Sequence, residues 1–145
     1  IKYNGQNKGI VKKVVRIIEQ NHFEDHCVVT STNYSFLKQV KKANPDIRTG
    51  YIMTMTYGTI SRIEAADFFS VKYTYVDEAV VREAHSLGKE VHAWTVNYRG
   101  DIKRMLDVGV DNIITDNPVL VRKVKNQESD MQTDFWDLMR YAFKM

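Results

Sequence analysis

The sequence is short of the residues on which several common protein classes depend. Its 145 residues include a single cysteine, Cys27, so the chain can form neither an intramolecular disulfide nor a cysteine zinc site. Two prolines and seven glycines exclude a collagen-like or low-complexity chain. Lys, Arg or Asp interrupts every long apolar run within about eight residues, so we expect no membrane-spanning helix. We also expect no secretory leader.

The sequence also has no large excess of positive or negative charge. Twenty-one Lys and Arg residues face eighteen Asp and Glu, a net charge of +3, and no basic stripe alternates with aromatic residues. We therefore expect no nucleic-acid partner. With 43% hydrophobic and 27% charged residues, a chain of this length fits one globular domain with a substantial core. It opens on Ile1 rather than Met, in a tripeptide that resembles a strand end, and we interpret it as a piece of a longer protein.

Short β-branched runs alternate with amphipathic segments, which is typical of an α/β fold with a largely parallel sheet. The predicted helices are Lys8–Asn21, Tyr34–Ala43, Thr59–Ala66, Asp77–Leu87 and Asp101–Val108. The predicted strands are Cys27–Thr30, Gly50–Met53, Phe68–Tyr73, Val91–Val96 and Asn112–Thr115. Gly88 and Gly109 each follow a helix, where a left-handed residue is favoured, and indicate repeated βα units. Five strands plus a stub at Ile1–Lys2 fit an open sheet or part of a (β/α)8 barrel, which needs about 250 residues.

The last part of the chain differs in composition from the rest. Asp116-Asn117-Pro118 is a standard helix start, with a capping side chain before a proline at the first helical position. A polar linker follows at Asn126–Asp130, and apolar residues then recur at helical spacing (Phe135, Leu138, Met139 and Ala142). We predict a linker and amphipathic helical tail over 125–145. That helix would pack on the side of the domain, or meet a membrane surface or a partner.

In a parallel α/β fold, functional side chains gather at the carboxyl ends of the strands. Applied to the predicted strands, this rule selects Lys2, Ser31, Tyr73, Trp94, Asn97 and Asp116. The histidines lie elsewhere and are expected to be structural or exposed (His22, His26, His85 and His92). The sequence contains no H-E-x-x-H, C-x-x-C or glycine-rich phosphate loop. By its own chemistry, the chain does not hold a complete active site.

Two runs in the last third resemble conserved blocks of the glycerophosphodiester phosphodiesterases. They are Gly88–Asn97, which contains W-T-V-N, and Met105–Pro118, which contains G-V-D-x-I-I-T-D-x-P. Upstream, Val28–Ser31 and Asn44–Tyr51 resemble further blocks of that family in the same order. Ile1-Lys2 would be the end of its E-[IL]-K strand. The resemblance covers residues 1–124, which we interpret as the carboxyl-terminal part of the catalytic domain, and leaves out the tail at 125–145.

The resemblance implies the carboxyl-terminal half of a TIM-type (β/α)8 barrel. The family hydrolyses glycerophosphodiesters to glycerol 3-phosphate and an alcohol, in lipid and glycerol metabolism. It uses a divalent cation, Ca²⁺ or Mg²⁺, held by acidic residues, with two histidines as general acid and base. Those groups come from H-R-G, E-x-D and H-D motifs, none of which occurs in this sequence. We therefore expect an active metal-dependent parent protein, and a fragment that has no metal site of its own and is inactive.

The resemblance also implies roles for three residues. Lys2 would be catalytic, because a fixed ammonium group can stabilise the negative charge that develops on a phosphodiester under attack. Trp94 would bind substrate as an aromatic wall beside the glycerol moiety. Ser31 would also bind substrate, although Thr32 stands where the family commonly has Phe.

Two other interpretations stay open at this point. The chain could be a non-catalytic half-barrel that serves as an interaction module, or an unrelated doubly wound phosphate-binding domain with a reversal of strand order. A half-barrel would expose apolar strand residues and sheet edges, so we expect a homodimer or association with the missing half. The parent could be cytoplasmic or membrane-associated, with a membrane tether in its missing amino-terminal part.

Overall fold

The fold is seen in a computed structural model that describes residues 1–2, 9–54 and 63–127. Five parallel strands form one sheet in the order β1-β2-β3-β4-β5. The strands are β1 (Val28–Ser31), β2 (Arg48–Met53), β3 (Phe68–Lys72), β4 (Glu90–Trp94) and β5 (Asn112–Ile113). The α-helices are α1 (Ile10–Gln20), α2 (Tyr34–Ala43), α3 (Glu78–Ser86), α4 (Arg99–Asp107) and a last helix over 118–127. Single 3₁₀ turns lie at Glu24–His26 and Tyr73–Tyr75.

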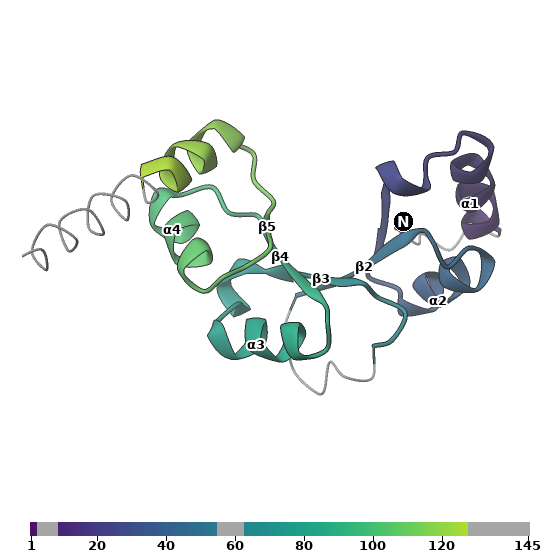
Figure 1. The fold of residues 1–145 in the computed structure, drawn as a ribbon, viewed down its shortest axis with the longest axis horizontal. Helices are drawn as coiled ribbons and strands as arrows, with labels where there is room; N and C mark the ends of the chain where they lie inside the picture. Colours follow the sequence, from purple (N-terminus) through teal and green to yellow (C-terminus); the bar gives the residue numbers. More distant parts are fainter. Residues whose placement is uncertain (3–8, 55–62, 128–145) are drawn as a thin grey trace, which may run out of the picture.

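The sheet is curved, and its helices lie along the outside of the curve (Figure 1). In that view α1 and α2 lie at one end, α3 below the middle, and α4 with the last helix at the other end. Strands that follow one another in sequence are neighbours throughout, with no reversal of order in the described sheet. This is a partial (β/α)8 barrel that is not closed, as predicted. The doubly wound alternative is wrong, because that fold requires a switch point in the strand order.

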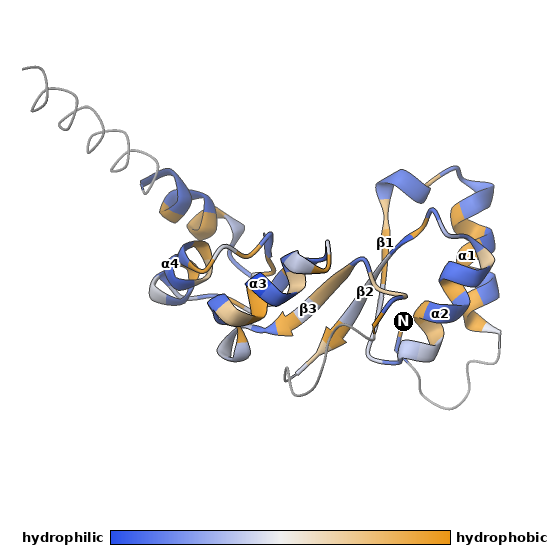
Figure 2. Ribbon diagram, turned by 60° about the horizontal axis from the view of Figure 1, so that its bottom comes forward, coloured by the Kyte–Doolittle hydropathy of each residue, from blue (hydrophilic) through white to orange (hydrophobic). Residues whose placement is uncertain are grey.

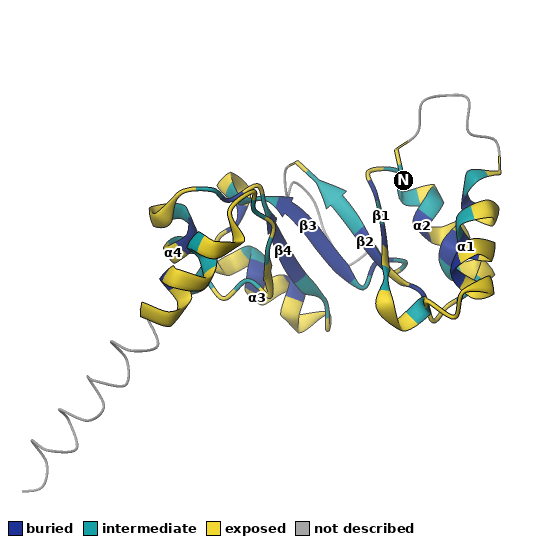
Figure 3. Cartoon of the chain, turned by 90° about the horizontal axis from the view of Figure 1, so that it is seen from above, coloured by how far each residue is buried: buried dark blue, intermediate teal, exposed yellow. Residues whose placement is uncertain are grey.

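Side chains of alternate residues divide each strand between two environments. On β3, Phe69 and Val71 belong to the larger core cluster, between the sheet and the outer helices, while Phe68 and Ser70 line the concave side. A smaller core joins α1 and α2 to β1 around Val15, Val29 and Val40. The helices turn their apolar stripes towards the sheet, and β3 and β4 are largely buried (Figures 2 and 3). The outer face is therefore already covered by helices.

The helix boundaries follow from local capping chemistry. The Asn33 carboxamide oxygen accepts a hydrogen bond from the backbone of Ser35 at the start of α2, and the carboxylate of Asp77 accepts one from Val80 in α3. Gly88 and Gly109 have φ of 67° and 79°, the left-handed conformation predicted for both. None of the helices in the described residues is long and apolar enough to cross a bilayer.

One predicted helix is wrong in its described part, and another lies outside the described residues. Of Thr59–Ala66, only residues 63–66 are described, and they form a turn without regular secondary structure rather than a helix. The reason is that Ala65 bonds to neighbouring elements instead: its N–H donates to the Tyr34 hydroxyl (3.1 Å) and its carbonyl accepts from the Thr49 hydroxyl (3.0 Å). The predicted tail helix falls within 128–145, beyond the last described residue.

Candidate active site

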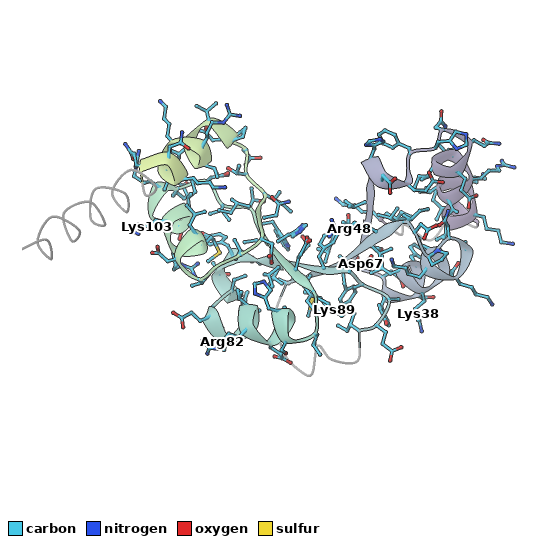
Figure 4. The ribbon with its side chains drawn as sticks, in the orientation of Figure 1. Lys38, Arg48, Asp67, Arg82, Lys89 and Lys103 are labelled. Atoms are coloured by element: carbon cyan, nitrogen blue, oxygen red, sulfur yellow. The ribbon has the colours of Figure 1, made fainter. Side chains whose placement is uncertain are left out.

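The concave side of the sheet contains one large hollow. Its volume is about 1080 Å³, and its lining alternates along every strand, as β-strand geometry requires. Members near the carboxyl ends of the strands include Lys2, Thr32, Trp94 and Ile114. Figure 4 shows Arg48, another lining residue, on the open side of the sheet, whereas the labelled Arg82 lies on the opposite, helical side. The hollow is therefore the inside of the partial barrel.

Two of the three predicted site residues line this hollow directly. Lys2 lies beside the carboxyl end of β1, and Trp94 is the last residue of β4. The Trp94 indole N–H donates to the carbonyl of Ser70 on β3 (2.9 Å), which fixes the ring while leaving the side chain only half-buried. The structure thus brings a cation and an aromatic surface to one cavity from segments that are far apart in the sequence.

Ser31 plays a different part in the described contacts. It is fully buried, and its hydroxyl donates to the carbonyl of Ile1 (2.8 Å) and accepts from the N–H of Asn33 (3.0 Å). The amino group of Ile1 also donates to the carbonyl of Thr30. These bonds hold the first two residues beside β1, so Ser31 orients the backbone next to Lys2. A direct contact between Ser31 and substrate stays a prediction.

Asn97 and Asp116 join the two loops that follow β4 and β5. The Asn97 side chain donates to the Asp116 carboxylate (2.6 Å) and accepts from the Asp116 backbone N–H (2.9 Å) and the Thr115 hydroxyl (3.1 Å). In the described contacts, these two residues therefore hold the loops together. Tyr73, also at a strand end, packs against the helix-side core and is not part of the lining.

Sequence reasoning missed a charged cluster at the amino ends of the strands. The Arg48 guanidinium lies 2.9 Å from the Glu90 carboxylate, which also lies 2.9 Å from His92 Nε2. The His92 ring stacks on Phe68 with 4.0 Å between centroids, and His92 is 9% exposed, as expected of a structural histidine. The bond with His92 and the Arg48 charge lower the pKa of Glu90, against the effect of burial. The sequence offered one signal for this cluster. Glu90, His92 and Trp94 alternate along β4, so their side chains share one face of the sheet.

A resident metal ion does not fit the described residues. In these ranges, no three His, Cys, Asp or Glu side chains converge as a metal site would require. Two described histidines already pair with carboxylates: His92 with Glu90, and His85 of the outer helix α3 with Asp111, each at 2.9 Å. The cation implied by the resemblance therefore has no ligand set among these residues.

Comparison with known proteins decides the family. The model of the glycerophosphoryl diester phosphodiesterase family matches residues 1–120, most of the chain. The chain belongs to this family. The match ends just inside the last helix.

Individual relatives agree with the family match. A glycerophosphodiester phosphodiesterase of Arabidopsis thaliana is 31% identical over 77% of this chain and 35% of its own length. One from Caldanaerobacter subterraneus is 31% identical over 79% of this chain and 50% of its own. The structure of an Oleispira antarctica phosphodiesterase in complex with the product sn-glycerol-3-phosphate matches with a TM-score of 0.69 at 19% identity, over 80% of this chain and 49% of that one. The chain spans half or less of the length of these relatives.

Proposed function

We propose that this chain is the carboxyl-terminal part of an enzyme that hydrolyses glycerophosphodiesters to glycerol 3-phosphate and an alcohol. The observation that carries the proposal is that Lys2 and Trp94 line one hollow in a chain of the phosphodiesterase family. That the Oleispira protein holds sn-glycerol-3-phosphate supports a glycerol phosphate as the group bound.

The roles of the two residues follow from their chemistry. Attack on a phosphodiester adds negative charge to the non-bridging oxygens, and the Lys2 ammonium group would stabilise that charge most in the transition state. The Trp94 ring would lie against the carbons of glycerol and keep water from them. The bond from its indole to Ser70 keeps the ring in place before substrate arrives, so little ordering is needed on binding.

The remaining catalytic groups would come from the rest of the enzyme. A Ca²⁺ or Mg²⁺ ion and two histidines would be supplied by a preceding half-barrel, because the described residues contain no suitable cluster. We accordingly propose that this chain alone turns over no substrate. Loss of even one general acid or base commonly costs a factor of about 10² or more in rate.

Binding and turnover test the proposal separately. Trp94 and Trp136 are the two tryptophans, so a Trp136→Phe background reports on Trp94 alone. We expect glycerol 3-phosphate to change its fluorescence, and Lys2→Ala to weaken that binding only slightly, because the ammonium group acts mainly in the transition state. Turnover is followed as release of glycerol 3-phosphate from a glycerophosphodiester with Ca²⁺ or Mg²⁺. The 145-residue chain should show none, and the longer protein should be active.

The assays also address the second candidate, a non-catalytic interaction module. Its support is the absence of a metal-type cluster among the described residues. A longer protein that binds glycerol 3-phosphate but hydrolyses nothing would favour the module. Metal-dependent turnover by repeatedly purified 145-residue chain would overturn the proposal that a preceding half-barrel supplies the catalytic groups.

A further inference from the structure

One end of the molecule carries exposed apolar and cationic side chains that the proposed function does not use. Tyr98 is 74% exposed at the start of α4, and Val119 is 63% exposed in the first turn of the last helix. Arg99, Arg122 and Lys123 are exposed beside them in the sequence. We call these five residues the rim patch.

Two hydrogen bonds show that the parts of the rim patch lie together. Asn97 bonds to Asp116 before the last helix (2.6 Å), and the Arg99 guanidinium donates to Gln127 at its far end (2.7 Å). The segment that contains Tyr98 therefore runs alongside this helix. Within the helix, Val119, Arg122 and Lys123 follow the i, i+3, i+4 spacing of one face. The face turned inward is apolar instead, with Val124 buried in the core.

Positive charge predominates in the described part of the last helix. The last helix contains Arg122, Lys123 and Lys125 and no acidic residue. Asp116, just before this helix, is bonded to Asn97, and Asp101 lies in the first turn of α4. An exposed tyrosine and an aliphatic residue among cations match the interface of an anionic bilayer, where the ring and the methyl groups enter the headgroup layer and the cations meet phosphate.

We propose that the rim patch docks on the surface of an anionic phospholipid membrane. The rim patch lies close to the mouth of the hollow. Trp94, at the carboxyl end of β4, lines the hollow and lies four residues before Tyr98. Ile114, just after β5, also lines it and lies two residues before Asp116. Docking there would place the mouth of the hollow at the surface from which phospholipid breakdown products are released. The inference is independent of catalysis, since it concerns adsorption of the chain itself.

The experiment uses the 145-residue chain and vesicles of phosphatidylcholine, with or without phosphatidylserine, in a sedimentation assay. We expect binding only with phosphatidylserine, and release as salt is raised. Each cation near an anionic surface contributes a factor of about five, so Arg122→Gln with Lys123→Gln should weaken binding about 25-fold. Tyr98→Ser should weaken it at unchanged net charge.

The matched control removes two cations from the other end of the molecule. Lys12→Gln with Lys13→Gln changes exposed lysines of α1, which Figure 1 places at the opposite end of the sheet. This variant has the same net charge as the rim variant and should bind vesicles like the unchanged chain. Equal losses in both double variants would overturn the proposal in favour of non-specific attraction. Absence of vesicle binding, or binding to a protein partner that the rim substitutions abolish, would also overturn it.

Discussion

Asp67 and Asp111 make the same pair of hydrogen bonds to the strand beside each of them. The N–H of Asp67 donates to the carbonyl of Thr49 (2.8 Å), and its carboxylate accepts from the N–H of Thr49 (2.6 Å). Asp111 does the same with Val91, at 3.0 and 2.7 Å. Thr49 and Val91 are each the second residue of their strands, β2 and β4. The same arrangement thus joins β3 to β2 and β5 to β4 at the amino ends of these strands.

A side chain from an outer helix completes each of these contacts. Lys41 of α2 lies 2.8 Å from the Asp67 carboxylate, and His85 of α3 lies 2.9 Å from that of Asp111. Burial raises the pKa of both carboxyls, but the bonds from these side chains and from the strand N–H groups outweigh it. The net effect is that the pKa of each lies below its ordinary value.

Removing one of these carboxylates should cost stability. We expect Asp111→Ala to lower the free energy of unfolding by about 1–3 kcal/mol, because the N–H of Val91 loses its partner. Glu78→Ala is the control: Glu78 pairs with Arg82, and both side chains are 72% exposed. Its cost should stay below about 1 kcal/mol. Urea unfolding measures both, and equal losses would contradict a special role for Asp111.

The lowered pKa values predict a dependence of stability on acid. Each carboxyl ionises at lower pH when folded than in the unfolded chain, where its pKa is about 3.9. Its contribution is therefore complete above about pH 4 and is lost as pH falls through the folded pKa. Asp67→Asn with Asp111→Asn keeps acceptor oxygens without the charges, so the stability of this variant should fall less steeply in acid. Urea unfolding at a series of pH values tests this, and an unchanged slope would contradict it.

Gly50 should tolerate no side chain. A Cβ at this position would lie 2.2 Å from two ring atoms of Phe68, which packs over β2. We expect Gly50→Ala to cost about 1–3 kcal/mol through displacement of the ring. Gly100→Ala has nothing within 4 Å and should be neutral or stabilising. In a thermal unfolding series, Phe68→Leu should remove most of the extra cost of Gly50→Ala.

In the longer enzyme that we propose, Lys2→Ala should lower kcat far more than it raises KM. The reason is that the ammonium group meets charge that develops mainly in the transition state. Lys12→Ala on the exposed face of α1 serves as the matched control and should leave both constants unchanged. A change confined to KM would instead make Lys2 a contact to the ground-state phosphate.

The open concave side predicts self-association of the isolated chain. Val28 and Ile114 line the hollow and are 48% and 41% exposed, and exposed apolar patches and parallel strand edges promote pairing. We expect light scattering to give about twice the chain mass of 16.9 kDa. Val28→Glu with Ile114→Glu should shift the chain to monomer. A monomer without substitution at micromolar concentration would contradict the prediction.

The features that the sequence determined by itself are the short-range ones, chiefly where helices begin and end. The helix at Tyr34–Ala43 was predicted to the residue, and the starts at Asp77 and Asn117 and the ends at Gly88 and Gly109 were recognisable. Each depends on hydrogen bonds or backbone conformations within a few residues of one another, so the residue types suffice. The family motifs added the order of the strands.

Only the tertiary structure decided how polar side chains on the strands are used. The burial of the Ser31 hydroxyl against Ile1, and the assembly of Arg48, Glu90 and His92, depend on which residues of separate strands stand opposite one another. A shift of one residue in register would turn every side chain of a strand to the other face. That register is set by packing of the whole sheet against its helices, which no local pattern of residues contains.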